Sequence, residues 1–123
     1  MAARYDWIDA YLLAKPGVTR DLQSDWNWVR YHVGGKMFAA ICRDEADQPV
    51  YITLKLEPAE GEFWRGQYTD IIPGYYMNKL HWNSVKANGA VPDNVLRDLL
   101  EHAYRVVLGG LSKKLQREIL AGV

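Results

Sequence analysis

The chain has a single cysteine, Cys42, and no apolar run long enough to cross a bilayer. One thiol cannot form an internal disulfide, which removes the framework that many small secreted domains depend on. A membrane-spanning helix needs about 20 apolar residues, and the first residues lack the basic stretch followed by an apolar segment of a signal peptide. We therefore expect a cytoplasmic protein that does not enter a membrane.

The chain also lacks a surplus of charge of either sign, since fifteen lysines and arginines balance fifteen aspartates and glutamates. This balance excludes a strong overall positive field that would attract nucleic acid. The distribution is less even than the total. Residues 57–70 carry four acids against one arginine, whereas residues 71–91 hold Lys79, His81 and Lys86 and no acid. The sequence is therefore compatible with a local basic patch.

Motifs for catalysis and metal binding are absent as well. His32, His81 and His102 are widely spaced and form neither His-x-His nor His-Glu-x-x-His, and no Gly-x-Ser-x-Gly or glycine-rich phosphate loop occurs. Cys42 ends an apolar run, where a buried and inert thiol is the usual outcome. The acids of residues 44–47 are typical of a solvated turn rather than of an iron site. We expect no enzyme activity, no cofactor and no metal.

The length of 123 residues and the 49% of hydrophobic residues suit one domain with one core. We expect a single domain spanning residues 1–123 and a monomer. The predicted helices are residues 4–14, residues 57–68, a long helix between Pro92-Asp93 and Gly109-Gly110, and a short one after Ser112; the predicted strands are residues 25–33, 36–43, 50–56 and 81–87. Residues 71–79 are expected to form a proline-glycine turn. This order of elements predicts an α+β fold.

The apolar side of residues 50–56 predicts the core face of the sheet. Antiparallel pairing brings to the same side three residues of the preceding strand, namely Met37, Ala39 and Ile41. A strict two-residue loop at the glycine pair would turn Arg30 and His32 toward the core. One extra loop residue, as in a bulged turn, would place Val29 and Tyr31 there instead, and we expect this bulge.

Five pieces of the sequence, taken in order, resemble the MmcQ/YjbR family over nearly the whole chain. They are Lys15-Pro16-Gly17-Val18, Gly35-Lys36-Met37-Phe38-Ala39, Leu54-Lys55, the block from Ile72 to Val85, and Tyr104 before Leu111-Ser112-Lys113-Lys114. The long block is specific, and its part from Asn78 to Ser84 is also similar to the strand motif of frataxins. The chain has His102-Ala103-Tyr104 where the family often has serine before the tyrosine.

The resemblance implies a frataxin-like fold, in which the N-terminal and C-terminal helices cover one face of an antiparallel sheet. It also implies the family's description as double-wing DNA-binding proteins. A fold does not by itself confer a function, so the residues have to be considered on their own.

Residues 75–86 combine cations, amides and aromatic rings without an acid. Lysine suits phosphate, asparagine suits base edges and aromatic rings suit base stacking. Lys36 at the hairpin tip and Lys55 on the open sheet face extend the same chemistry. The predicted site residues are Lys36, Lys55, Tyr75, Tyr76, Asn78, Lys79, His81, Trp82, Asn83 and Lys86. We expect weak or non-specific DNA binding, without catalysis, through the edge of the sheet.

Two other interpretations of this stretch stay open. Trp82 and one tyrosine can serve as core packing, with Lys79 and Lys86 as ordinary solvated charges. Alternatively, Tyr75, Tyr76 and Trp82 can anchor a protein partner, because aromatic side chains dominate such interfaces.

Overall fold

The computed structural model describes residues 4–74 and 77–122. Its helices are α1 (Ile8–Leu13), α2 (Pro58–Gln67), α3 (Asp93–Gly109) and α4 (Lys113–Leu120), and its strands are β1 (Val18–Gln23), β2 (Trp28–Val33), β3 (Lys36–Arg43), β4 (Pro49–Lys55), β5 (Ile71–Pro73) and β6 (Trp82–Lys86). The strands form one antiparallel sheet in the order β1-β2-β3-β4-β6-β5. The predicted α+β fold is confirmed.

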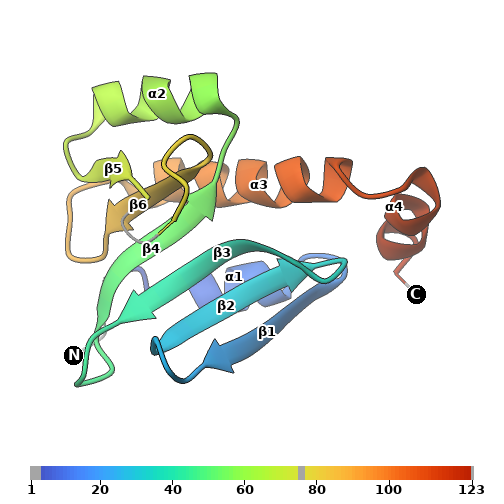
Figure 1. Ribbon diagram of the computed structural model, residues 1–123, viewed down its shortest axis with the longest axis horizontal. Helices are drawn as coiled ribbons and strands as arrows, with labels where there is room; N and C mark the ends of the chain where they lie inside the picture. Colours follow the sequence, from blue (N-terminus) through green and yellow to red (C-terminus); the bar gives the residue numbers. More distant parts are fainter. Residues whose placement is uncertain (1–3, 75–76, 123) are drawn as a thin grey trace.

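The helices that pack on the sheet lie on one of its faces, which we call the covered face, and they leave the other face open (Figure 1). α1 and α3 lie behind the sheet in that view, with α3 against β2, β3 and β4. α2 joins them, because its Gly61 packs against Asn83 of β6 and its Glu60 contacts His102 of α3. α4 lies at one end of the molecule (Figure 1). Within the described residues, no helix is both long and apolar enough to cross a membrane.

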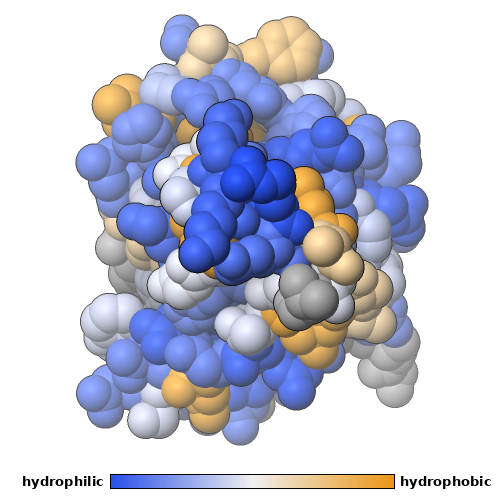
Figure 2. Space-filling view, turned by 90° about the vertical axis from the view of Figure 1, so that its right-hand side faces the viewer, coloured by the Kyte–Doolittle hydropathy of each residue, from blue (hydrophilic) through white to orange (hydrophobic). Residues whose placement is uncertain are grey.

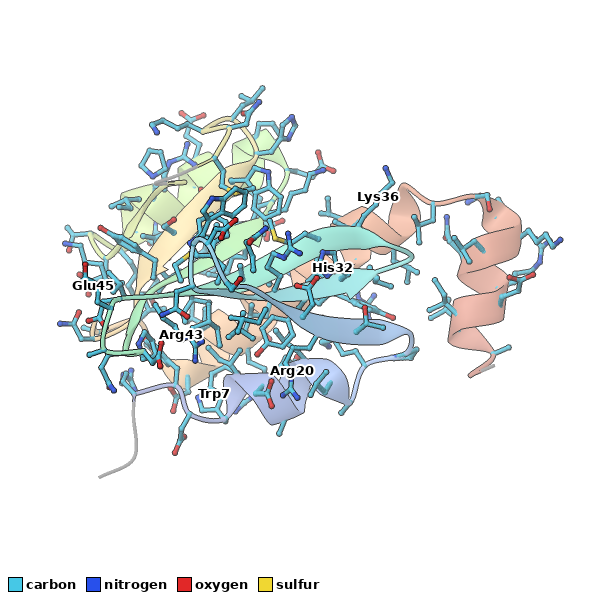
Figure 3. All side chains as sticks on the ribbon, turned by 60° about the horizontal axis from the view of Figure 1, so that its bottom comes forward. Trp7, Arg20, His32, Lys36, Arg43 and Glu45 are labelled. Atoms are coloured by element: carbon cyan, nitrogen blue, oxygen red, sulfur yellow. The ribbon has the colours of Figure 1, made fainter. Side chains whose placement is uncertain are left out.

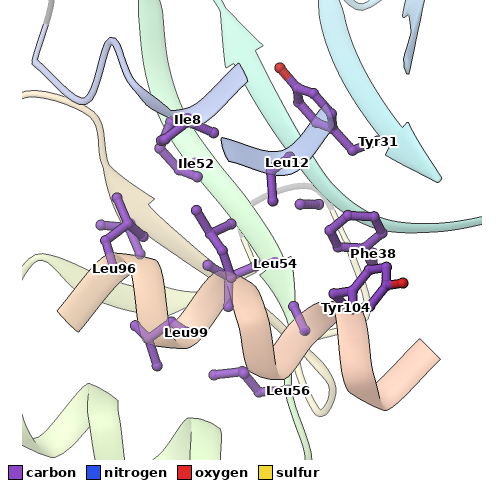
Figure 4. Close-up of a cluster of buried hydrophobic side chains, with 14 of the residues drawn as sticks. Ile8, Leu12, Tyr31, Phe38, Ile52, Leu54, Leu56, Leu96, Leu99 and Tyr104 are labelled. Carbon is purple, nitrogen blue, oxygen red and sulfur yellow. The ribbon is translucent and has the colours of Figure 1, made fainter. Parts of the chain in front are cut away.

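The covered face carries the main hydrophobic core. Apolar residues recur along α3 at three- and four-residue spacing, which gives this helix one apolar stripe to set against the sheet. Figure 4 shows the buried side chains of α1, β2, β3, β4 and α3 that meet there, among them Ile8, Leu12, Tyr31, Phe38, Ile52, Leu54, Leu56, Leu96, Leu99 and Tyr104. Burial of each leucine or isoleucine contributes roughly 1.5–3 kcal/mol, so this cluster dominates the stability of the fold.

The hairpin between β2 and β3 contains the predicted bulge. The extra residue lies in strand β3 rather than in the loop. The two glycines form a strict two-residue loop with φ values of 58° and 79°, a left-handed conformation that matches the twist of the flanking strands. Tyr31 pairs with Ala39 and His32 pairs with Met37, so Phe38 is the extra residue. The bulge keeps Tyr31 in the core and turns Met37 to the open face. The core position predicted for Met37 was wrong.

Two strands at the edges of the sheet were not predicted. β1 carries the polar run Thr19-Arg20-Asp21, which masks the alternation of apolar and polar residues expected of a strand. The ion pair Arg30–Asp21 joins β1 to β2. β5 occupies the start of the segment predicted as a proline-glycine turn. It has only three residues and ends at Pro73, whose missing N–H is tolerated at the edge of a sheet.

Candidate functional site

Three of the predicted site residues lie together on the open face. Lys55 pairs with Trp82, and Tyr51 pairs with Lys86, across β4 and β6. Ile52, Leu54 and Val85 alternate with them and are buried in the core, so these four side chains point away from the helices. Directly paired residues have their Cβ atoms about 5 Å apart. The open face therefore brings two lysines and an indole ring into one surface.

Asn83 lies on the covered face, which corrects its place among the predicted DNA contacts. It pairs with Leu54 and is 1% exposed. Arg65 of α2 donates a hydrogen bond from Nη1 to Asn83 Oδ1. A Cβ atom at Gly61 would lie 2.9 Å from Asn83 Nδ2, so only glycine lets α2 approach β6 this closely. Asn83 joins α2 to the sheet and is too deeply buried to contact a macromolecule.

The connection between β5 and β6 lies over the open face. Gly74 donates its backbone N–H to the carbonyl of Trp82 at 2.7 Å, which closes the base of the connection. Met77, further along, packs against the cluster of Trp28 and Cys42 on the open face. The connection therefore borders any ligand that binds on the open face.

Several predicted site residues belong to this connection. Asn78 is exposed, and its Oδ1 accepts a hydrogen bond from the backbone N–H of Leu80 at 2.8 Å. Lys79 is exposed and its Nζ donates to a backbone carbonyl of the same connection at 3.3 Å. His81 is half-buried just before β6. Tyr75 and Tyr76 lie outside the described residues.

Lys36 lies at the Lys55 end of the sheet and far from Lys86. Figure 3 shows Lys36 at the tip of the β2–β3 hairpin and Arg43 at the other end of the sheet. The two residues are the first and last of β3, which places them about 20 Å apart at roughly 3.3 Å per residue. Cys42 pairs with Tyr51, which in turn pairs with Lys86. Lys36 and Lys86 therefore stand at opposite ends of the molecule's sheet.

The open face is hollowed into a pocket that sequence analysis missed. Its volume is about 610 Å³, within the range of about 300–1,000 Å³ that is usual for ligand sites. Trp28, Ala40 and Cys42 form a small buried cluster at its base, separate from the main core. The lining residues are Trp26, Trp28, Arg30, Met37, Cys42, Arg43, Asp44, Val50, Tyr51 and Met77. The pocket is thus mainly aromatic and aliphatic, with charged groups among its lining.

The only thiol of the chain lies in this pocket. Cys42 Sγ is 3.5 Å from Thr53 Oγ1, which is 3.0 Å from Ser84 Oγ, so a row of polar atoms crosses three strands. Burial raises the pKa of Cys42 to about 11, and the hydrogen bond with Thr53 opposes this shift only weakly. A thiol with such a pKa is neutral near pH 7 and is a poor nucleophile. In the parts of the chain that the structure describes, no three His, Cys, Asp or Glu side chains are grouped to hold a metal ion.

Six of the fifteen acidic side chains form ion pairs with cations. The ion pairs of the described residues are Arg4–Asp93, Lys15–Glu101, Arg20–Asp9, Arg30–Asp21, Arg43–Asp47, His102–Glu60 and Arg105–Glu101. None of these pairs between described residues involves Lys55, Lys79 or Lys86. Three cations on and beside the open face are therefore without a carboxylate partner among the described residues, although the net charge of the chain is neutral.

A second basic group lies on α4, away from the open face. Lys113, Lys114 and Arg117 are all exposed there. Figure 2 looks onto this end of the molecule and shows hydrophilic side chains gathered over α4. Ile119 is the residue of α4 that is buried, and it packs beside Gly17. α4 therefore presents a solvated basic face away from the pocket of the open face.

Known proteins match this chain in sequence and in fold. The sequence model of the YjbR family matches residues 13–106. The chain is 29% identical over 110 residues to the uncharacterized protein YjbR of Escherichia coli K12, covering 89% of this chain and 91% of that one. It is 34% identical over 92 residues to the uncharacterized protein YbdF of Escherichia coli O157:H7, covering 75% and 74%.

Two solved structures have the same fold. The crystal structure of a Deinococcus radiodurans protein superposes with a TM-score of 0.83 at 28% identity and covers 96% of this chain and 88% of that one. The crystal structure of a Pseudomonas syringae protein gives a TM-score of 0.70, covers 84% and 97%, and at 23% identity shows similarity of fold alone. The resemblance noted in the sequence is confirmed, and the chain belongs to the YjbR family.

Proposed function

We propose that the protein is a non-catalytic DNA-binding module that contacts phosphates with the lysines of its open sheet face. One observation carries this proposal: Lys55 faces Trp82 across two strands, Lys86 lies further along the same face, and neither lysine has a carboxylate partner among the described residues. Cations that neutralise phosphates release counterions and supply most of the affinity of non-specific binding. A cytoplasmic location and a monomeric state remain predictions from the sequence.

The ion pair between Arg30 and Asp21 does not oppose this role. Arg30 and Asp21 form a bidentate pair, with Nε to Oδ1 at 2.8 Å and Nη2 to Oδ2 at 2.7 Å. The carboxylate is therefore neutralised locally. The surplus of positive charge is small, and with few phosphates neutralised we expect a weak complex, with a dissociation constant of about 10⁻⁴–10⁻⁶ M at physiological salt.

The test is an NMR titration of the ¹⁵N-labelled protein with a DNA duplex and with one of its strands, at low and at near-physiological salt. We expect backbone shifts along β4, β6 and the connection before β6, and an affinity that falls as salt rises. Replacing Lys55 and Lys86 by glutamine should flatten the plot of log affinity against log salt by about 1.4–1.8, since each lost phosphate contact removes about 0.7–0.9.

The matched control replaces two lysines of α4, Lys113→Gln and Lys114→Gln, which remove the same charge from another exposed surface. This control should leave the salt slope unchanged. Equal slopes for the two double variants would show that only the overall charge matters. Absence of any shift at millimolar DNA would reject the function, and a salt-independent interaction with a protein would point to the alternative of a protein-binding surface.

A further inference from the structure

We propose that the pocket of the open face receives one unpaired nucleobase of a bound single strand. This inference rests on the proposed DNA binding and deepens it, since it names single-stranded DNA as the ligand and gives its base a defined place. The alternative, a ligand bound only through its phosphates, would leave an aromatic pocket beside the lysines without a role.

The walls of the pocket suit the flat face of a base. Trp26 is 59% exposed and lies edge-on to Trp28, with ring centroids 5.4 Å apart and an angle of 64° between the rings. Met37 and Met77 add polarizable thioethers to the lining. Stacking of a base on an aromatic ring is largely independent of base identity, because every base has a π-face. Trp26 offers the exposed ring on which such stacking is possible.

The polar atoms of the pocket match a neutral heterocycle better than an ion. Arg43 Nε is buried and has no acceptor among the described residues, while Nη2 donates to Asn27 Oδ1 at 2.7 Å. Asp44 Oδ1 accepts two backbone N–H groups of its own turn, and the described residues donate no hydrogen bond to Oδ2. A free anion would be repelled by Asp44, and a free cation would be repelled by Arg43. A base edge carries both acceptors and donors, so it suits a lining that contains both a cation and an anion.

The lysines lie where the phosphates of such a strand would run. Tyr51 lines the pocket and pairs directly with Lys86. Lys55 lies four residues beyond Tyr51, about 13 Å along β4 at roughly 3.3 Å per residue. A strand that turns one base toward Trp26 has Lys86 beside it and reaches Lys55 further along β4.

A duplex does not fit this arrangement. Paired bases expose only their edges, in grooves that accept a helix or a two-stranded ribbon, whereas the pocket is a hollow in the face of a six-stranded sheet. Sheet faces that carry aromatic rings bind splayed, unpaired bases. The pocket therefore selects single strands over duplexes.

The test compares three labelled probes of equal length by fluorescence anisotropy: a thymidine oligonucleotide, an abasic strand with the same sugar-phosphate backbone, and a duplex. We expect the thymidine strand to bind about ten-fold more tightly than the abasic strand. This ratio lies in the lower half of the affinity gain that stacking of one base on an aromatic ring usually gives. Trp26→Ala should remove this ratio and leave abasic binding unchanged. The matched control is Phe63→Ala on α2, because Phe63 is also an exposed aromatic, at 56%, and packs edge-on against another ring.

Binding of a base in the pocket and DNA binding as such can fail separately. If the thymidine and abasic strands bind equally well, or if the duplex binds more tightly than the thymidine strand, the base pocket is rejected while DNA binding stands. If Phe63→Ala weakens thymidine binding as much as Trp26→Ala does, the assignment to this pocket is rejected too. If none of the three probes binds, both the pocket and the proposed function fall.

Discussion

The two faces of the sheet use alternate residues of the same strands for different purposes. In β4, Ile52 and Leu54 are buried in the main core, whereas Tyr51 and Lys55 on the open face are half-buried. The covered face is filled by three helices. Over the open face, within the described residues, lies only the connection around Met77. The difference shows that the helices supply most of the stability and leave the open face available for binding.

The open face is nevertheless not simply a solvated surface. Trp28 is 5% exposed and Cys42 2%, and with Ala40 they form a cluster of their own that does not join the main core. Above this cluster Trp26 is 59% exposed and Val50 40%, and large exposed apolar patches usually mark a binding site. The apolar base of the pocket is therefore the feature that most needs a functional explanation.

The largest expected effect tests the covered face. Leu54 is fully buried against α3, so Leu54→Ala should lower the free energy of unfolding by about 3 kcal/mol, through lost burial and the cavity left behind. The control is Val50→Ala, on the same strand but 40% exposed at the pocket, with an expected loss below about 1 kcal/mol. Urea unfolding followed by circular dichroism measures both. Equal losses would contradict the division of roles between the faces.

A smaller effect concerns the residue that the sequence assigned to the wrong face. Asn83→Ala should destabilise the protein by about 2 kcal/mol, because it leaves Arg65 without its buried acceptor. The DNA affinity of this variant should match that of the wild type. Asn78→Ala, at an exposed asparagine, is the matched control and should cost less than about 0.5 kcal/mol. Loss of DNA affinity by folded Asn83→Ala would return this residue to the site.

Local pattern predicted most of the fold but not its details. The alternation over residues 50–56 and the spacing of Leu96, Leu99 and Leu100 oriented β4 and α3 correctly, except at Val50, which is 40% exposed and lines the pocket instead of the core. The position of the bulge was not predictable, because placing the extra residue in the loop or at Phe38 turns β2 to the same face. Only packing of the phenyl ring against Tyr104, with ring centroids 5.6 Å apart, distinguishes the two.

The site was predictable only in part, for two physical reasons. Lys55, Trp82 and Lys86 share the open face because of the two-residue period of a strand, and applying that period to residues 82–86 would have excluded Asn83. The pocket, by contrast, depends on Met77 packing against Trp28, a contact between segments nearly fifty residues apart along the chain. No local pattern specifies such a contact.

The smallest effect tests whether the base of the pocket is dry. Burial raises the pKa of Cys42 to about 11 from a model-compound value of 9.0. The thiol of the unfolded chain therefore ionises first, and its contribution to stability is full below pH 9 and is lost as the pH rises toward 11. Cys42→Ser lacks this ionisation and keeps a partner for Thr53. Between pH 8 and pH 10 the wild type should lose about 1 kcal/mol of unfolding free energy relative to Cys42→Ser.

Urea unfolding of both proteins at the two pH values measures this difference, and the contributions of the other titrating groups cancel between them. A difference that stays constant with pH would mean that the Cys42 thiol ionises as readily in the folded protein as in the unfolded chain. Water would then reach the base of the pocket freely, the two faces would differ less than their burial indicates, and stacking of a base in that pocket would lose the apolar surroundings that favour it.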